Sequence, residues 1–226
     1  FVFLVNISYV YSNGNFSQIG ETVKFVNSGI SFAKMNSTRI AIIDTGVDRM
    51  GAYDFNGSTW SQVGSNISVP AGGIYAMAGL NGSRVAIEMA TGAKLVTYSF
   101  NGSDWAQVGN QFTAPAGSPA MASLNKSTVA WISSTGDDIT TYIFDETDWV
   151  QMGNVLDITD GDDYAMASLN GSRIVIYTGF GGLNLRVYNW NNSDWTQVGN
   201  SYKVMGSSAE GALASLNGSR VTFTSG

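Results

Sequence analysis

Ala76-Met77-Ala78-Gly79-Leu80-Asn81-Gly82-Ser83 is the stretch that decides the fold, because close variants of it recur along the chain. Its ending returns as Met35-Asn36-Ser37-Thr38, Leu124-Asn125-Lys126-Ser127, Leu169-Asn170-Gly171-Ser172 and Leu216-Asn217-Gly218-Ser219. A second phrase, aromatic-x-Gln-aliphatic-Gly, begins at Phe16, Trp60, Trp105, Trp149 and Trp195. Successive copies of either phrase lie 44 to 47 residues apart. A fixed period of this length, filled with short strand-like segments, predicts a β-propeller with one blade per repeat.

Each repeat has the pattern of four antiparallel strands. In the second full repeat, residues 76–80 are small enough for a crowded axis, and Asn81-Gly82 suits a two-residue hairpin turn with positive φ. Residues 84–88 and 94–100 read as the second and third strands, and the outer strand begins at Trp105 after a tight turn. We expect its aromatic ring to pack between blades, and a loop over residues 110–118 to return the chain to the axis.

The fold class expected from this pattern is all-β, a five-bladed β-propeller that spans residues 1–226 as a single domain. Four blades are expected at about residues 31–65, 75–109, 119–153 and 164–199. The two ends of the chain read as complementary halves of one repeat. The prediction is a closing blade of residues 211–226 plus 1–20, in which N-terminal strands three and four join C-terminal strands one and two. Closure of this kind removes exposed sheet edges.

The order of an inner strand, an Asn-Gly hairpin, a second strand and a late Trp resembles the secreted propeller repeats of the FG-GAP or integrin-α type. The calcium loop of that family, Asp-x-Asp-x-Asp-Gly, is replaced here by Asn-Gly-Ser, and its Phe-Gly pair is missing from the inner strands. The resemblance therefore implies neither calcium binding nor integrin-like ligand recognition. The expected blade count also resembles five-bladed lectins of the tachylectin type.

Composition excludes several functions. Charged residues make up only 12% of the chain and the net charge is −6, which argues against a nucleic-acid partner. No run of 18 or more apolar residues is present, so we expect no membrane insertion. The chain lacks Cys and His, which excludes disulfides, thiolate nucleophiles, His metal ligands and a Ser-His-Asp triad. It begins at Phe1 without a signal peptide, which predicts a mature, trimmed product or one module of a longer protein.

Eleven sites match the sequon Asn-x-Ser/Thr, in which the second residue is not Pro. They are Asn6, Asn15, Asn36, Asn56, Asn66, Asn81, Asn101, Asn125, Asn170, Asn191 and Asn217. One interpretation is that Asn-Gly-Ser is good hairpin chemistry copied by duplication. The other is N-glycosylation of a secreted protein, with N-linked glycans as partners.

Degenerate copies favour glycosylation. Four sites lack the Gly that a tight turn favours after the Asn, yet keep the hydroxyl at the third position: Asn15, Asn36, Asn125 and Asn191. All sites except Asn6 and Asn66 fall in the first-to-second or third-to-fourth turns, which share one face of the disc in a meandering blade. We therefore expect a sugar-coated face and an extracellular or cell-surface location.

The opposite face is expected to hold most of the acid: Asp44, Asp48, Asp137, Asp138, Asp157, Asp160, Asp162 and Asp163. The cluster at residues 157–163 does not match a calcium loop, so we expect a solvated acidic loop, no metal and no cofactor. Asp44, Asp138 and Asp163 occupy similar places in different blades, as a glycosidase pair would. None of these three lies in an apolar setting that would tune its pKa, so we expect no enzyme.

The repeated Gln and aromatic side chains also have two interpretations. Gln18, Gln62, Gln107, Gln151 and Gln197 are either five equivalent ligand contacts or, as we expect, structural hydrogen bonds within each blade. The aromatic residues that precede them are either inter-blade core, as we expect, or platforms for sugars.

Two functional classes remain. The first is a non-enzymatic structural or adhesive module of an extracellular assembly, such as a cell coat or filament, with copies of itself or neighbouring modules as partners. The second is a multivalent lectin that binds carbohydrate. A lectin with five sites should repeat its pocket residues, whereas the loops at residues 69–72, 158–161 and 203–206 differ from one another. That difference favours the structural module. The hydrophobic start of the chain, residues 1–5, is expected to be buried in its own ring or in that of a neighbour.

Overall fold

A computed structural model describes the chain as an all-β propeller. The described residues are 29–71, 75–89, 94–113, 119–133, 138–158, 164–178, 184–204, 211–215 and 221–225, together with the short stretches 3–5, 9–12, 15–18 and 23–25. Within them, no helix is long and apolar enough to cross a membrane.

Four sheets of four antiparallel strands form the blades, and in each sheet the strands pair in chain order. Blade 1 consists of β5 (Ile30–Lys34), β6 (Arg39–Asp44), β7 (Arg49–Phe55) and β8 (Trp60–Ser68). Blade 2 consists of β9 (Tyr75–Asn81), β10 (Arg84–Met89), β11 (Lys94–Phe100) and β12 (Trp105–Thr113). Blade 3 consists of β13 (Pro119–Ser123), β14 (Thr128–Ser133), β15 (Asp138–Phe144) and β16 (Trp149–Asp157). Blade 4 consists of β17 (Tyr164–Asn170), β18 (Arg173–Thr178), β19 (Asn184–Trp190) and β20 (Trp195–Lys203).

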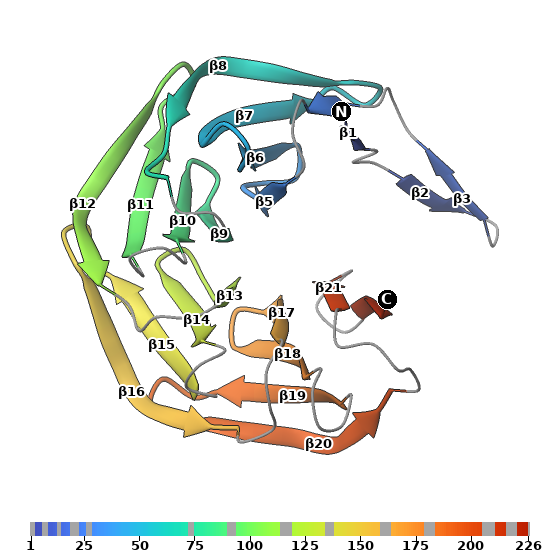
Figure 1. The fold of residues 1–226 in the computed structure, drawn as a ribbon. Helices are drawn as coiled ribbons and strands as arrows, with labels where there is room; N and C mark the ends of the chain where they lie inside the picture. The colour runs from blue at the N-terminus through green and yellow to red at the C-terminus, as the bar shows by residue number, and fades with distance from the viewer. Residues whose placement is uncertain are drawn as a thin grey trace.

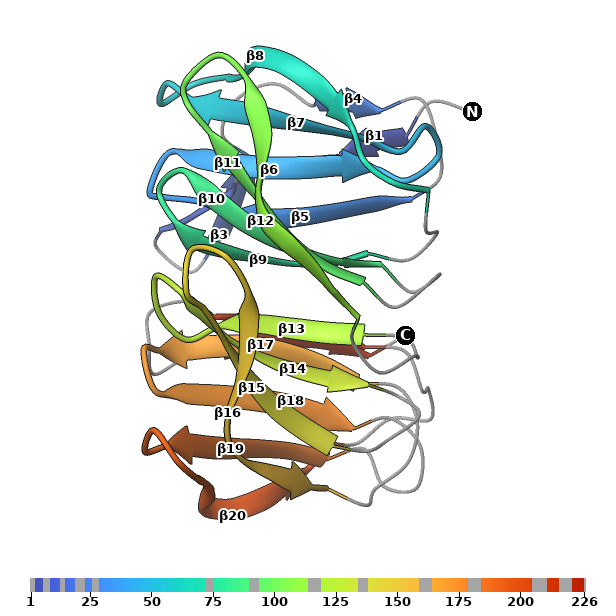
Figure 2. The same cartoon turned by 90° about the vertical axis from the view of Figure 1, so that its left-hand side faces the viewer.

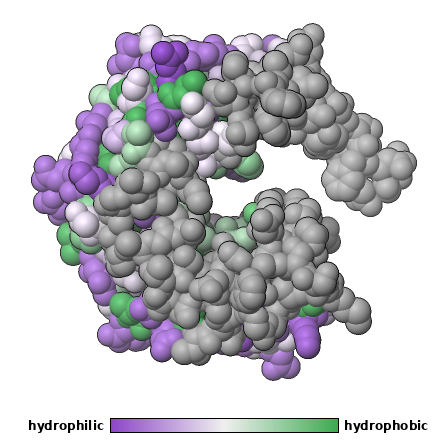
Figure 3. Space-filling view, in the orientation of Figure 1, coloured by the Kyte–Doolittle hydropathy of each residue, from purple (hydrophilic) through white to green (hydrophobic). Residues whose placement is uncertain are grey.

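The sheets stand around a common axis with β5, β9, β13 and β17 innermost and β8, β12, β16 and β20 outermost (Figure 1). Small side chains on the inner strands, such as Ala33, Ala78, Ala122 and Ala167, allow the strands to approach one another at the axis, as the sequence predicts. The outer strands are mostly exposed, and hydrophilic residues predominate along this edge (Figure 3).

The core lies between blades, because both faces of the second and third strands are covered. In β10, Val85 and Ile87 belong to a buried apolar cluster shared with blade 1, whereas Ala86 belongs to a cluster shared with blade 3. A third cluster joins blades 3 and 4. Strands buried on both faces read as nearly continuous hydrophobic runs, which is why residues 84–89 show little alternation.

Each outer strand is longer than expected. β12 continues to Thr113, where the sequence predicts a loop from residue 110 onward. The strand continues because Gly109, with φ of 71°, lies within a bulge: the ladder steps from Thr97–Val108 to Leu95–Phe112. The same step occurs in the other three blades at Gly64, Gly153 and Gly199, which have φ of 68°, 62° and 71°. Only glycine adopts this conformation without strain.

The prediction of five blades is wrong: the structure has four complete blades. The C-terminal strands β21 (Gly211–Ser215) and β22 (Val221–Ser225) pair with each other, and β21 packs beside β17. The N-terminal segment forms two separate two-stranded sheets, β1 (Phe3–Val5) with β4 (Val23–Phe25) and β2 (Tyr9–Ser12) with β3 (Asn15–Gln18).

The predicted closing ladder is missing because its strands are paired elsewhere. The expected third strand over residues 3–11 is divided between β1 and β2, and β4, in a stretch expected to connect blades, occupies the edge of β1. Among the described strands, none of the N-terminal ones pairs with β22, and the β2–β3 and β21–β22 hairpins stand apart in Figure 1.

Candidate functional site: the turn face

The turns that carry the sequons lie on one face of the propeller, named here the turn face. In a four-stranded antiparallel meander the first-to-second and third-to-fourth turns share an edge, and Figure 2 shows these tight turns together on the left. Seven of the predicted Asn residues occupy them. They are Asn36, Asn56, Asn81, Asn101, Asn125, Asn170 and Asn191.

Each of these side chains organises its own turn. The Oδ1 atom of Asn101 accepts hydrogen bonds from the backbone N–H groups of Ser103 and Asp104, both at 2.9 Å, and from the Ser103 hydroxyl at 3.0 Å. In all seven turns Oδ1 accepts the backbone N–H two residues later, at 2.8–3.0 Å, and the hydroxyl of the same residue, at 3.0–3.5 Å. These are Asx turns, in which a short polar side chain mimics a backbone turn.

Two assumptions behind the sequence argument for glycosylation are therefore wrong. Gly82 and Gly171 in the inner turns do not have positive φ, so Ser37 and Lys126 can replace glycine there without strain. The Ser or Thr hydroxyl also has a structural role, because it donates to the Asn side chain. Retention of the hydroxyl in degenerate copies does not by itself separate glycosylation from turn chemistry.

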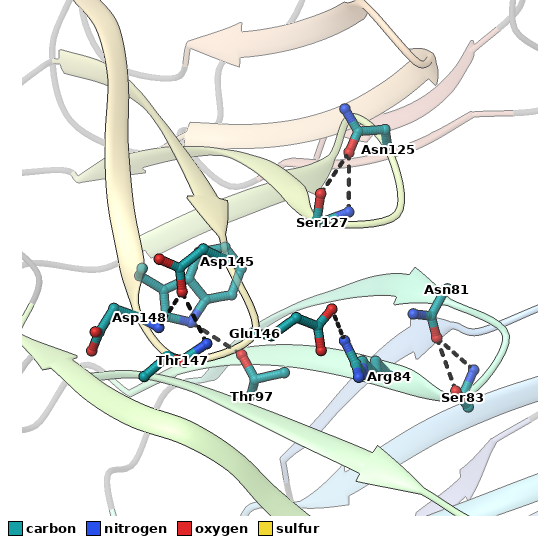
Figure 4. Close-up of polar contacts among 11 residues, drawn as sticks. Asn81, Ser83, Arg84, Thr97, Asn125, Ser127, Asp145, Glu146, Thr147 and Asp148 are labelled. Carbon is teal, nitrogen blue, oxygen red and sulfur yellow. Dashed lines mark hydrogen bonds and ion pairs between the residues drawn. The ribbon is translucent and has the colours of Figure 1, made fainter.

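The outer turn of blade 3 shows what such a turn needs. Asp145 stands where the other blades have Asn, and its Oδ1 accepts the N–H groups of Thr147 at 2.9 Å and Asp148 at 2.7 Å (Figure 4). These two backbone hydrogen bonds lower the pKa of the Asp145 carboxyl. A carboxylate thus builds the same turn without a sequon, so the turn requires an acceptor oxygen and not an amide.

The amide nitrogens of the seven Asn side chains differ in availability. Nδ2 of Asn56 donates to the Thr59 hydroxyl at 3.1 Å. In the other six turns no described residue bonds Nδ2, and Figure 4 shows the nitrogens of Asn81 and Asn125 directed away from their turns. Asn36 and Asn81 are half-buried, and the remaining five Asn residues are exposed.

The other predicted sequons lie elsewhere. Asn66 is an exposed residue of β8, and its Oδ1 occupies the space beside Gly51, 2.4 Å from where a Cβ would be. Asn15 begins β3. Asn6 and Asn217 lie outside the described residues.

Two ion pairs lie on the turn face. Arg39 at the start of β6 binds Asp54 at the end of β7 through Nε and Nη2, at 2.6 and 2.7 Å. Arg84 at the start of β10 reaches Glu146 in the outer turn of blade 3, at 2.7 Å, and this hydrogen bond lowers the pKa of the Glu146 carboxyl (Figure 4). Asp104, Asp145, Asp148 and Asp194 in the outer turns and Lys126 in an inner turn also lie on this face, so it carries charge beyond the two ion pairs.

The bulge glycines, which end the second repeated phrase, lie where neighbouring blades contact each other on this face. After three of the four bulge glycines, a backbone N–H donates to a carbonyl oxygen in the outer turn of the next blade: Ser65 to Ser103 at 2.7 Å, Asn110 to Thr147 at 2.7 Å, and Asn154 to Ser193 at 2.8 Å. A Cβ at Gly64, Gly109 or Gly153 would stand only 2.0–2.4 Å from the same carbonyl oxygen. The glycine is therefore required by close approach as well as by its φ.

Two of these contacts between blades include a side-chain hydrogen bond that the sequence analysis did not predict. Asn110 Nδ2 donates to Asp148 Oδ1 at 2.9 Å, and Asn154 Nδ2 donates to Asp194 Oδ1 at 2.5 Å. The signal was present, because Asn follows the repeated glycine at positions 110, 154 and 200 and Asp precedes the Trp at positions 104, 148 and 194.

Three of the five repeated Gln residues and three of the five repeated aromatic residues have the structural roles that were expected. The Nε2 atoms of Gln62, Gln107 and Gln197 donate to the carbonyl oxygens of the bulge glycines two residues later, at 3.0–3.2 Å. Trp105, Trp149 and Trp195 are at most 7% exposed, which confirms them as inter-blade core. Trp149 Nε1 donates to Thr97 of blade 2 at 3.1 Å, and Trp195 Nε1 donates to Thr141 of blade 3 at 3.0 Å.

The predicted acids of the opposite face do not form a catalytic or metal constellation among the described residues. Asp44 ends β6, where it accepts the Gly46 N–H at 3.0 Å, and Asp138 begins β15 opposite Asp157 of β16. Asp137, Asp160, Asp162 and Asp163 lie outside the described residues. No group of three acids able to hold a metal ion occurs within the described chain.

One buried acid was missed. Glu88 lies between blades 2 and 3 with no exposed surface, and burial raises its pKa to about 7. Its place within the apolar run of residues 85–89 was the available signal. Because the carboxyl group does not reach the surface, it is not positioned to act on a substrate.

The axis contains a cavity of about 620 Å³, lined by the inner strands. The equivalent residues Phe32, Met77, Met121, Met166 and Leu213 all line it. Among the described lining residues Lys34 alone is charged, and most of the others are apolar. Ser123, Ser168 and Asn170 add neutral polar groups, so the cavity combines apolar walls with a few polar groups, as ligand sites commonly do.

Comparison with known proteins establishes the fold and no more. No family model matches the chain, and no curated protein matches it, so the resemblance to FG-GAP repeats stays a prediction. A functionally unknown protein from Desulfotomaculum acetoxidans aligns over 92% of this chain and 66% of its own length, with a TM-score of 0.70 and 9% identity. KlHsv2 with loop 6CD replaced by a Gly-Ser linker aligns over 91% of this chain and 65% of its own, with a TM-score of 0.58 and 13% identity.

A mutant of the Aleuria aurantia lectin in complex with Fucα1-6GlcNAc also aligns, over 91% of this chain and 75% of its own length. Its TM-score is 0.61 and its identity 13%. These likenesses show that the chain has a β-propeller fold and that it spans about two thirds of the length of the first two structures.

Proposed function

We propose that this chain is a non-enzymatic module of an extracellular assembly, N-glycosylated on its turn face. One observation carries this proposal: seven sequon Asn residues stand on one face, and in six of them the Asx turn uses only the oxygen of the amide. N-glycans attach to the amide nitrogen, so the group to be modified is the one that the turn leaves available.

The charge distribution supports a packing role. The ion pairs Arg39–Asp54 and Arg84–Glu146 neutralise two charges of each sign on the turn face, and the four outer strands carry only two charged residues, Asp157 and Lys203. A surface with few net charges offers little repulsion against neighbouring modules. Attached glycans would keep one face soluble and leave the outer edge and the opposite face for contacts.

Asp145 provides an internal test of the glycosylation. Asp145→Asn converts the Asp-Glu-Thr turn of blade 3 into a sequon while keeping the acceptor oxygen that organises the turn. Secretion from a eukaryotic host should give a glycosylated wild-type protein, and the variant should gain one further glycan by intact mass and peptide mapping. Asn81→Asp is the matched control: it keeps the acceptor and should lose one glycan without unfolding. A secreted wild-type protein with the mass of the bare polypeptide would contradict the proposal.

The second candidate is a multivalent carbohydrate-binding protein, and the fold likeness to the Aleuria aurantia lectin supports it. The buried positions of Trp105, Trp149 and Trp195 count against repeated sugar platforms on the outer strands. A glycan array with enzymatically deglycosylated protein separates the two candidates. Binding to a defined sugar with a dissociation constant of about 1 μM would favour the lectin, and absence of binding would favour the structural module.

A further inference from the structure

The outer strand of blade 4 repeats the contact surface that blades 1 to 3 use to hold their neighbours. Gly199 forms the same bulge, with the ladder stepping from Val187–Val198 to Leu185–Tyr202. Asn200 follows it, as Asn110 and Asn154 follow their glycines. In blades 1 to 3 this surface binds the outer turn of the next blade through one backbone hydrogen bond. Blades 2 and 3 add a hydrogen bond between an Asn and an Asp side chain.

In blade 4 this surface is uncovered by any described residue. A Cβ at Gly199 would meet nothing within 4 Å, whereas at the other three bulges it would strike the next blade. Tyr202 is 66% exposed and Val198 is 38% exposed. The residues equivalent to Tyr202 are Ile67, Phe112 and Leu156, and all three pack against the inter-blade clusters.

A matching surface lies at the other end of the described blades. The outer turns of blades 2, 3 and 4 are held by Gly64, Gly109 and Gly153, and among the described residues none grips the outer turn of blade 1 in this way. That turn contains Ser58, which is equivalent to Ser103 and Ser193, and Thr59, whose hydroxyl is at the place of the Asp148 and Asp194 carboxylates.

We propose that the blade 4 edge formed by Val198, Gly199, Asn200 and Tyr202 binds the blade 1 outer turn of a second copy of this chain. The Asn200 N–H would donate to the Ser58 carbonyl, Asn200 Nδ2 would donate to the Thr59 hydroxyl, and Tyr202 would pack as Phe112 packs on Tyr142, with ring centroids 5.0 Å apart there. Because the two surfaces are different, the contact is head-to-tail and produces chains of copies or a ring. This contact rests on the proposed assembly role and names its partner, and it needs the sequon Asn56 of the same turn to be free of glycan; Asn56 is the sequon whose Nδ2 is bonded within its own turn.

Cross-linking tests the contact in the full chain, which has no cysteine of its own. One preparation carries Asn200→Cys and the other carries Thr59→Cys. Mixed under oxidising conditions, they should form a covalent heterodimer more rapidly than either forms a homodimer. The double variant Asn154→Cys with Asp194→Cys is the positive control, because these two side chains meet within one chain and should link without changing the molecular mass.

Sedimentation supplies the second readout. The wild-type protein should associate reversibly with concentration, and Tyr202→Arg should weaken that association about tenfold or more. Val155→Arg is the matched control, because Val155 is an exposed residue of the outer strand of blade 3, 45% accessible, and lies outside the contact. A strictly monomeric wild-type protein with no preferential heterodimer would overturn the proposal and assign the blade 4 edge to another part of the same chain. Glycosylation in the secretion experiment would be unaffected by that result.

Discussion

The interface between blades 1 and 2 and the interface between blades 2 and 3 have the same strand geometry but different chemistry. In the first, Ile43 and Ile87 lie in one apolar cluster. In the second, the equivalent positions hold Glu88 and Trp131. Both Glu88 carboxyl oxygens and Trp131 Nε1 are buried without a hydrogen-bond partner among the described residues. A buried polar group without a partner costs free energy, so Glu88 and Trp131 destabilise the second interface.

The buried environment of Glu88 favours the protonated form of its carboxyl group. Burial raises its pKa to about 7, and the neighbouring Trp131 indole lowers it by a smaller amount without a hydrogen bond to either oxygen. Tyr142 is the other ionisable residue of this buried cluster, and burial raises its pKa above the usual value, so it stays neutral. The interface between blades 3 and 4 returns to the apolar pattern with Ile132 and Ile176. Glu88 thus makes the interface between blades 2 and 3 sensitive to pH, unlike the other two.

The largest predicted effect comes from removing this acid. The pKa of Glu88 is about 7 in the folded protein against 4.5 for the ordinary group, so the folded state binds more protons between these values. The stabilising contribution is complete below pH 4.5 and is lost as the pH rises to about 7, and amounts to about 3 kcal/mol at about 1.4 kcal/mol per pKa unit. Glu88→Ile should therefore gain stability over wild type as the pH rises from 4.5 to 8, measured by urea unfolding.

Glu88→Gln separates titration from polarity. It removes the ionisable group but leaves a buried amide, so it should lose the pH dependence of the wild type between 4.5 and 7 without the full stability of Glu88→Ile. If the wild type and Glu88→Gln show parallel stability profiles across this range, Glu88 does not titrate with a raised pKa and the comparison between interfaces fails.

A second difference between the interfaces concerns the outer-strand Trp residues. Trp149 at the interface of blades 2 and 3 donates to the buried Thr97 hydroxyl. Thr97→Val keeps the shape but leaves the indole N–H buried without an acceptor, which should reduce the free energy of unfolding by about 2 kcal/mol. Thr141→Val, which removes the equivalent acceptor of Trp195, should have a similar effect. Thermal unfolding of both variants measures it, and an unchanged midpoint would show that these hydrogen bonds contribute nothing net.

Local features of the fold were predictable from the sequence, whereas closure was not. The small residues at positions 76–80, the Asn turns and the buried Trp residues follow from patterns within a single repeat. The number of blades depends on which distant strand pairs with β22. In the structure the short strands β1 and β4 pair with each other instead. Hydrophobic alternation does not distinguish these pairings, because it indicates which residues share a face of a strand and not which strand pairs with it.

The candidate site was found for a partly wrong reason. The sequence located Asn81 and Asn125 correctly in turns, but it could not reveal that the Ser83 and Ser127 hydroxyls donate to them, since that depends on side-chain geometry. The hydrogen bond between Asn154 and Asp194 joins residues 40 positions apart. It was missed because each residue was considered only within its own repeat. Contacts between repeats are visible in a sequence only when copies are aligned with their neighbours.

The smallest predicted effect would sharpen the comparison by repairing the first interface. Trp105 Nε1 is buried without a partner among the described residues, and Ala52 stands where Thr97 and Thr141 accept from Trp149 and Trp195. Ala52→Thr should supply the missing acceptor and raise the free energy of unfolding by about 1 kcal/mol. The extra atoms have a precedent, because a fully buried Thr fits beside Tyr98 and Tyr142 at the two equivalent positions. Ala52→Val is the control for packing alone, since it adds the same volume without the hydroxyl. Equal stability of the Thr and Val variants would mean that the indole of Trp105 gains nothing from the new oxygen.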